Sequence, residues 1–317
     1  MSSDQEQLQE LLDRAPQPTR RPTVPAMEER LFQLVPVLDH GFIRVVDYMG
    51  DDGAVVQAAR VSYGAGTKSV RNDRGLLRYL MRHRHSTPFE MCEIKLHVKL
   101  PIFVARQWIR HRTANVNEYS ARYSILDREF YLPAPEDLAQ QSSSNRQGRD
   151  EILNPDQAAE VLRLLHRDAS QAYDTYEALI NDAGDGTPVD EGSPQLAREL
   201  ARMNLGLNYY TQWYWKVDVH NLLHFLSLRM DAHAQYEIRV YADIIGDILK
   251  SWMPITWEAF SDYRQGSAHL SREEVGLIQR MVAGEDPDEI LPASGLSLRE
   301  RKAMRKLLNL GPPKRKS

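Results

Sequence analysis

Between residues 91 and 100 the chain alternates strictly between apolar and polar side chains. The apolar positions are Cys92, Ile94, Leu96, Val98 and Leu100, and the polar ones are Glu93, Lys95, His97 and Lys99. Because successive side chains of an extended backbone point to opposite faces, a period of two is typical of a half-buried strand. The pattern therefore predicts a β-strand over 91–100, in a sheet that presents one face to a core.

The rest of the chain mixes predicted helices and strands without regular alternation. β-Branched and aromatic residues predict strands at 41–48 and 208–216. Apolar periodicity predicts helices at 54–62, from 72 or 73 to 81, from Pro101 onward, at 155–182, at 195–203, at 218–252 with a break near Asp231, and at 257–263. Loops are expected at 133–150 and 182–194. We therefore predict an α+β fold, with a mixed or antiparallel sheet flanked by long helices.

Three segments are distinguished by composition. Residues 1–25 are polar and Pro-rich, and we expect a mobile leader; 26–263 would form the main domain; 264–317 would form a charged helical appendage, broken at 285–287. The net charge of -4 argues against a general nucleic-acid binder. The single cysteine indicates a reducing compartment, and no apolar run reaches the roughly 18 residues of a membrane helix. We therefore expect a cytoplasmic protein that binds neither nucleic acid nor membrane.

Residues 110–123 gather three arginines, a histidine and several small polar side chains. A guanidinium is a planar fork of donors that suits phosphate and carboxylate oxygens. The alternative is a solvent-exposed basic face, because most charged segments of this kind are exposed to solvent. This run, however, directly follows the apolar segment 100–105, and charge held so close to a core usually has a partner. The segment is therefore a candidate pocket for an anionic small molecule.

This segment resembles the RHRxxSxNxxSxRY motif of the flavin-dependent thymidylate synthases. Seven positions match, and Asn115 stands where the motif has serine; the matches are Arg110, His111, Arg112, Asn117, Ser120, Arg122 and Tyr123. Three further blocks are similar to the same family in the same order: 59–63, 85–90 and 228–238. Together these blocks span about residues 41–263.

The resemblance implies reductive methylation of dUMP to dTMP by a homotetramer with shared active sites. Methylenetetrahydrofolate would give the carbon, FAD reduced by NADPH would give the hydride, and tetrahydrofolate would be released. The implied dUMP-binding residues are Gln107, Arg110, Glu118, Tyr119, Ser120, Arg122 and Arg229, with Arg229 and Ser120 catalytic. The implied FAD-binding residues are Ser62, His85, Thr87, Glu90, Arg110, His111, Arg112, Asp218, His220 and His224.

Some of these assignments have structural alternatives. Arg229 could form a buried ion pair with Asp231 or Glu237, and His85 could be a surface histidine. Ser120 lacks the G-x-S-x-G elbow of a hydrolase nucleophile.

The helix that begins near residue 218 departs from the family pattern. Asp218, His220 and His224 stand where some members have N-x-R-x-x-x-N. At 100° per residue the two histidines share one side, and Arg229 lies nearly opposite, so we expect the two sides to serve different sites. The histidines also have a zinc-like i, i+4 spacing, but Asn221 replaces the glutamate of a zinc protease, and no metal is expected.

Cys92 is the only cysteine that could attack the pyrimidine. The alternation places it on the apolar face, where burial raises a thiol pKa, so we expect a structural role. Two other functions compete with the flavin enzyme: an RNA-binding or RNA-modifying protein that uses residues 106–122 as a phosphate clamp, and an inactive scaffold of the same fold that binds a partner through its appendage. Uptake of FAD by the purified protein separates the flavin enzyme from both.

Overall fold

The computed structural model describes the chain except for residues 1–8, 11–12, 16, 62–72, 144–147 and 313–317. It divides into two compact units, residues 1–265 and 266–317. The first unit contains the sheet, its covering helices and both cavities considered below. In its described part, residues 266–312, the second unit has three helices around a small apolar core of its own.

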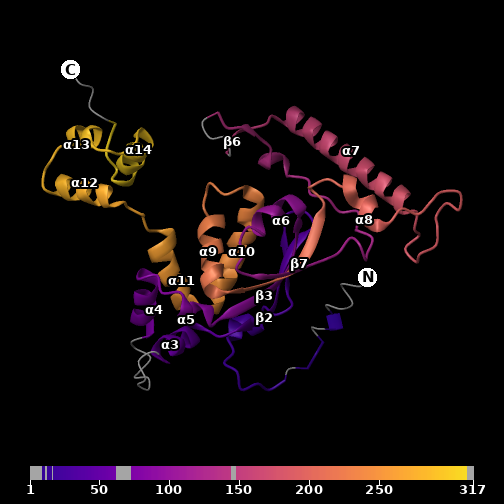
Figure 1. Ribbon diagram of the computed structural model, residues 1–317, viewed down its shortest axis with the longest axis horizontal. Helices are drawn as coiled ribbons and strands as arrows, with labels where there is room; N and C mark the ends of the chain where they lie inside the picture. The colour runs from indigo at the N-terminus through magenta and orange to yellow at the C-terminus, as the bar shows by residue number, and fades with distance from the viewer. Residues whose placement is uncertain (1–8, 11–12, 16, 62–72, 144–147, 313–317) are drawn as a thin grey trace. The chain divides into compact units, whose positions relative to one another are not determined.

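A five-stranded antiparallel sheet forms the centre of the first unit (Figure 1). The strand order is β1-β2-β3-β7-β4. The strands are β1 Leu34–Val37, β2 Gly41–Met49, β3 Glu93–Pro101, β7 Tyr210–Asp218 and β4 Asn115–Glu118. In the centre, Leu96 of β3 lies opposite Val45 of β2 and Trp215 of β7. The antiparallel sheet confirms the predicted α+β class.

Strand β3 has the two faces that its alternation predicts. Its even-numbered apolar residues are buried, whereas Lys95, His97 and Lys99 are only partly buried. The buried face belongs to the main core, which includes residues of α6, α9 and α10. These helices have the bounds α6 Ile102–Trp108, α9 Val219–Arg229 and α10 Tyr236–Trp252. Pro101 ends the strand as the residue that caps α6.

Other elements pack around this centre or extend from it. The helices of the first half are α2 Pro25–Glu28, α3 Asp52–Val61, α4 Asp73–Arg82 and α5 Thr87–Glu90. After them come the long α7 Pro155–Ile180, α8 Arg198–Ala201 and the 3-10 turn η3 Arg202–Asn204. Helix α11 Pro254–Phe260 continues into a π-helical turn, η4 Ser261–Gln265. The second unit has α12 Arg272–Val282, α13 Pro287–Ala293 and α14 Leu298–Leu307.

Several predicted boundaries were wrong. The expected loop 133–150 contains a 3-10 turn, η2 Pro135–Asp137, and the start of a hairpin made by β5 Ala139–Gln141 and β6 Arg149–Ile152. The helix expected at 195–203 begins only at Arg198, and the one expected at 257–263 begins at Pro254. The break near Asp231 is confirmed, but it extends over the six residues 230–235. Strands β1 and β4 were not predicted.

Candidate functional site

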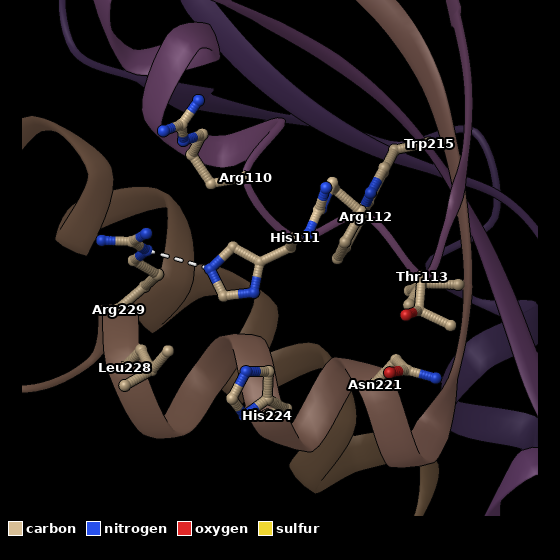
Figure 2. Close-up of a pocket in the computed structure, with 10 residues that line it drawn as sticks. Arg110, His111, Arg112, Thr113, Trp215, Asn221, His224, Leu228 and Arg229 are labelled. Atoms are coloured by element: carbon tan, nitrogen blue, oxygen red, sulfur yellow. Dashed lines mark hydrogen bonds between the residues drawn. The ribbon is translucent and has the colours of Figure 1, made fainter.

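The first half of the basic segment lies in the turn that leaves α6, beside helix α9. Trp108, at the end of α6, is fully buried and fixes where this turn begins. Together the turn and α9 enclose a cavity of about 330 Å³ (Figure 2). Its lining residues are Arg110, His111, Arg112, Thr113, Trp215, Val217, Asn221, His224, Leu228 and Arg229. Three arginines and two histidines make this a strongly basic cavity.

His111 and Arg229 are joined directly across this cavity. Arg229 Nε donates a hydrogen bond of 3.1 Å to His111 Nε2, drawn as the dashed line in Figure 2. The imidazole also contacts the rings of Phe225 and His224, with centroids 5.0 and 5.6 Å away. Burial, and then the charge of Arg229, lower the pKa of His111 to about 4. The ring is therefore neutral near pH 7, and its Nε2 can accept the hydrogen bond that Arg229 donates.

Arg229 does not form the buried ion pair considered as an alternative. Among the described residues, Asp231 contacts His233 at 2.9 Å, and Glu237 binds Arg149 at 2.5 Å. Burial lowers the pKa of Arg229. A half-buried guanidinium held by a neutral imidazole keeps its charge available for a ligand.

A second cavity, of about 420 Å³, is formed between α9 and the segments around α4, α5 and η4. It is lined by Met81, His85, Phe89, Thr113, His220, Asn221, Leu223, His224, Ser227 and Arg264. Thr113, Asn221 and His224 line both cavities. Three histidines predicted to bind flavin, His85, His220 and His224, are thus brought together here. His85 is exposed and lies near the ring of Tyr79, as well as lining the cavity.

The expectation that α9 separates the histidines from Arg229 was wrong for His224. His220 lines only the second cavity and Arg229 only the first, but His224 lines both. Asp218 lines neither. It is the N-cap of α9, where its carboxylate accepts hydrogen bonds from the backbone N–H of Asn221 at 2.9 Å and from its side chain at 2.7 Å. An aspartate at this position stabilises the helix start.

The remaining residues predicted to bind flavin lie at the edge of the second cavity or outside the described chain. Thr87 and Glu90 are the first and last residues of α5, and neither lines either of these two cavities, although Phe89 between them lines the second. Ser62 lies outside the described residues.

Comparisons with known proteins place this geometry in a family. Residues 44–255 match the family model described as thymidylate synthase complementing protein. A flavin-dependent thymidylate synthase of Gluconobacter oxydans is 65% identical over 294 residues, covering 93% of both chains. One from Ruegeria pomeroyi is 64% identical over 283 residues, covering 89% of this chain and 90% of the relative.

This chain belongs to the flavin-dependent thymidylate synthase family. Solved structures agree with this membership. The UMP/dUMP methylase PolB of Streptomyces cacaoi, in crystals with 5-Br UMP, is 33% identical and superposes with a TM-score of 0.62, covering 73% of this chain and 98% of PolB. A second crystal structure of PolB contains 5-Br dUMP, with the same identity and TM-score. Family membership favours the flavin enzyme over the two alternatives that the sequence left open, an RNA-binding protein and an inactive scaffold.

Of the residues that the resemblance implies for dUMP, Arg110 and Arg229 line the first cavity, and the others lie outside both cavities. Ser120 and the exposed Arg122 line neither cavity; Arg122 forms a 3.1 Å ion pair with Glu199, and its backbone N–H donates to Ser120 Oγ. The Glu118 carboxylate accepts a hydrogen bond from Thr211. The Tyr119 hydroxyl donates to the backbone oxygen of Ile125, and the Gln107 amide donates to Gln235. One chain thus places Arg229 in a cavity and these residues outside it.

Cys92 is fully buried, as the alternation of β3 predicts. Burial, more than any other cause, raises the pKa of its thiol to about 12. Within the described ranges, no group of three or more His, Cys, Asp or Glu side chains could hold a metal ion. No helix in the described parts of the chain has both the length and the apolar composition needed to cross a bilayer.

Sequence reasoning missed several residues that line the cavities. Trp215 and Val217 of β7, and Asn221 and Ser227 of α9, belong to neither motif nor block. Arg264 lies outside every block that resembles the family. Its only signal in the sequence is a charged residue next to an aromatic-rich helix end, which is too common to be informative.

Proposed function

We propose that this enzyme transfers the methylene carbon of methylenetetrahydrofolate to C5 of dUMP and reduces it to a methyl group. The two electrons arrive as a hydride that originates from NADPH, and the C5 hydrogen of dUMP leaves as a proton. Overall, dUMP, methylenetetrahydrofolate, NADPH and a proton give dTMP, tetrahydrofolate and NADP⁺. Family membership supports methylation of dUMP, and the identity of the carbon and hydride donors is part of the proposal.

The pairing of Arg229 with His111 carries the proposed role of Arg229 as a catalytic residue. Nε of Arg229 is held by the neutral imidazole, which leaves the two terminal nitrogens to donate to a pyrimidine oxygen. A guanidinium fixed in advance stabilises negative charge that develops on that oxygen as C5 becomes nucleophilic. The positive charge of the surrounding cavity also stabilises negative charge on that oxygen.

The phosphate of dUMP would be bound by Arg122 and Ser120, with Arg110, Glu118, Tyr119 and Gln107 completing the site. An arginine gives a bidentate charged contact, and a serine hydroxyl adds a donor. Gln107 Oε1 is buried without a hydrogen-bond partner in the described chain, so a donor on the nucleotide would satisfy it. Because Arg122 and Ser120 line neither cavity, we propose that each active site is shared between subunits of a homotetramer.

The donor set of the two cavities fits a flavin dinucleotide. Guanidinium, imidazole and hydroxyl groups match the phosphates and the polar ring edge of FAD, and the residues that would hold it are His85, Arg110, His111, Arg112, His220 and His224. Reduced FAD, when bound, supplies the hydride. Ser62, Thr87, Glu90 and Asp218 are proposed only from the family resemblance, and Asp218 would first have to release Asn221.

We also propose that no sulfur attacks the pyrimidine. Cys92, with a pKa near 12, is almost entirely protonated at neutral pH, and its side chain lies in the core. A single buried thiol is also what we expect of an enzyme that works in the reducing cytoplasm.

The reaction can be tested with purified full-length protein. FAD should colour the protein yellow, and NADPH should bleach it in the absence of oxygen. Tritium at C5 of dUMP should be released only when methylenetetrahydrofolate is also present. A protein that takes up no FAD, or that releases tritium without the folate, contradicts the proposed reaction.

A further inference from the structure

The second cavity contains an arginine that the family motifs do not include. Arg264 lines this cavity together with His85, His220 and His224, and none of the lining residues is acidic. The remaining polar lining groups are the side chains of Thr113, Ser227 and Asn221. Cations and hydroxyl or amide donors around one cavity are a chemistry that selects an anionic ligand.

Arg264 is carried on an unusual backbone element. Helix α11 ends at Phe260, and residues 261–265 continue it as a π-helical turn. Such turns contain one extra residue per turn, are rare, and occur frequently at functional sites. The extra residue changes the direction in which the following side chains point. Here the turn carries Arg264 at the wall of the cavity.

Contacts on both sides of Arg264 hold the turn in place. Arg78 of α4 donates to Glu258 at 3.0 Å, to Asp262 at 2.5 Å and to the hydroxyl of Tyr263 at 3.1 Å. The Arg78 guanidinium also lies 4.8 Å from the centre of the Tyr263 ring. On the other side, Gln265 Nε2 contacts Met230 Sδ at 3.4 Å. The position of Arg264 is therefore set by the fold around it.

Arg264 is partly desolvated and lies near a second guanidinium, that of Arg84. Burial, and then the neighbouring guanidinium of Arg84, lower the pKa of Arg264. Placing a cation where it is partly desolvated and next to another cation costs free energy. An anionic ligand in the cavity would offset this cost, because opposite charges at close range favour the charged form.

We propose that Arg264 binds the pyrophosphate of FAD, beside His220 and His224. This inference rests on the proposed function and extends it to a residue outside every family block. FAD is the cofactor that the proposed function already assigns to the histidines of this cavity, and its pyrophosphate needs several donors at once. The guanidinium offers a bidentate charged contact, and the imidazoles, the Thr113 hydroxyl and the Asn221 amide of the same wall add further donors.

Flavin affinity, measured on full-length apoprotein, tests this role without any turnover. We expect Arg264→Gln to weaken FAD binding by about 10- to 100-fold, the value of a hydrogen bond to a charged group. Affinity for riboflavin, which has no phosphate, should not change. Arg264→Lys keeps the charge but loses the bidentate geometry, so its loss of FAD affinity should be smaller and again specific to FAD. Arg163→Gln, an exposed arginine on α7, is the matched control and should bind both flavins normally.

The outcomes separate this inference from the proposed function. Unchanged FAD affinity in Arg264→Gln, or an equal loss of FAD and riboflavin affinity, overturns the role of Arg264. If Arg264→Gln fails to fold by circular dichroism, Arg264→Lys decides: an FAD-specific loss supports the role and an unchanged affinity overturns it. A wild-type protein that binds no FAD instead overturns the proposed function itself.

Discussion

The two ends of the segment 110–123 differ in whether they line a cavity. Its first four residues lie beside α9 and line the first cavity, where His111 accepts a hydrogen bond from Arg229. Its second half runs along the edge strand β4 and beyond, where Arg122 is exposed and paired with Glu199. One continuous motif thus serves two places on the chain. The first place is a cavity formed within one chain, and the second is an exposed surface.

The largest expected effect comes from removing Arg229, which lies in the first cavity and binds His111. We expect Arg229→Ala to fold and to lose turnover by about 10²–10³-fold or more, as when a fixed transition-state donor is removed. The measurement is the rate of tritium release from C5 of dUMP, with Arg163→Ala as a control and circular dichroism to confirm folding. Normal turnover in a folded Arg229→Ala protein would remove the catalytic role of Arg229.

Mixing two inactive variants tests whether Arg229 and Arg122 reach one active site from different subunits. Arg229→Ala and Arg122→Ala, co-expressed with different affinity tags, should recover about a quarter of wild-type activity when each site draws the two residues from different protomers. The reason is that half of the randomly formed pairs are mixed, and one of their two sites is intact. If purified mixed oligomers stay inactive, the sharing of active sites is wrong.

Replacing Cys92 tests whether a buried core residue, outside both ends of the segment, takes part in the chemistry. We expect Cys92→Ala to keep wild-type turnover and to lose about 0.5–3 kcal/mol of unfolding free energy, as for a typical core truncation. Urea unfolding and the tritium assay on the same preparation measure both. Loss of catalysis in a folded Cys92→Ala protein would restore a thiolate mechanism.

The smallest expected effect is on how the free energy of unfolding depends on pH, through His111. The folded protein holds the pKa of His111 at about 4, below its ordinary value of 6.5, so the unfolded chain takes up a proton first as the pH falls. Stability is therefore unaffected above pH 6.5, decreases as the pH falls from 6.5 towards about 4, and the loss is complete below that.

Because the ring is only half-buried, we discount the full shift and expect a loss of about 1 kcal/mol. Urea unfolding of the apoprotein at several pH values should show a smaller loss in acid for His111→Gln, which cannot take up the proton. Equal losses in the two proteins would show that the environment of His111 does not oppose its protonation.

The sequence was sufficient where burial imposes a period on the side chains. Strand β3 was predicted because one of its faces is buried and the other is not. The edges of the sheet were not predictable in this way. All four residues of β4 are exposed, and its pairing with β7 is a tertiary contact that leaves no apolar pattern. In β1, Pro36 argues against a strand, yet an edge strand tolerates it.

The candidate site was predictable only as far as its motifs reach. His111, Arg229 and the three histidines of the second cavity were found because fixed spacings carry the resemblance. Arg264 was not, because a π-helical turn changes the phase of a helix in a way that residue types do not reveal. Asp218 was matched by spacing alone, and the structure shows its carboxylate engaged as a helix cap.

Thr113, Asn221 and His224 line both cavities, so each of these residues can contact a ligand in either one. A ligand that moves these shared residues on entering one cavity changes the shape of the other cavity. Thermodynamic linkage then requires the influence to be equal in both directions, so a nucleotide that tightened the hold on a flavin would itself be held more tightly by the same factor. The order in which the two compounds arrive would not alter that factor.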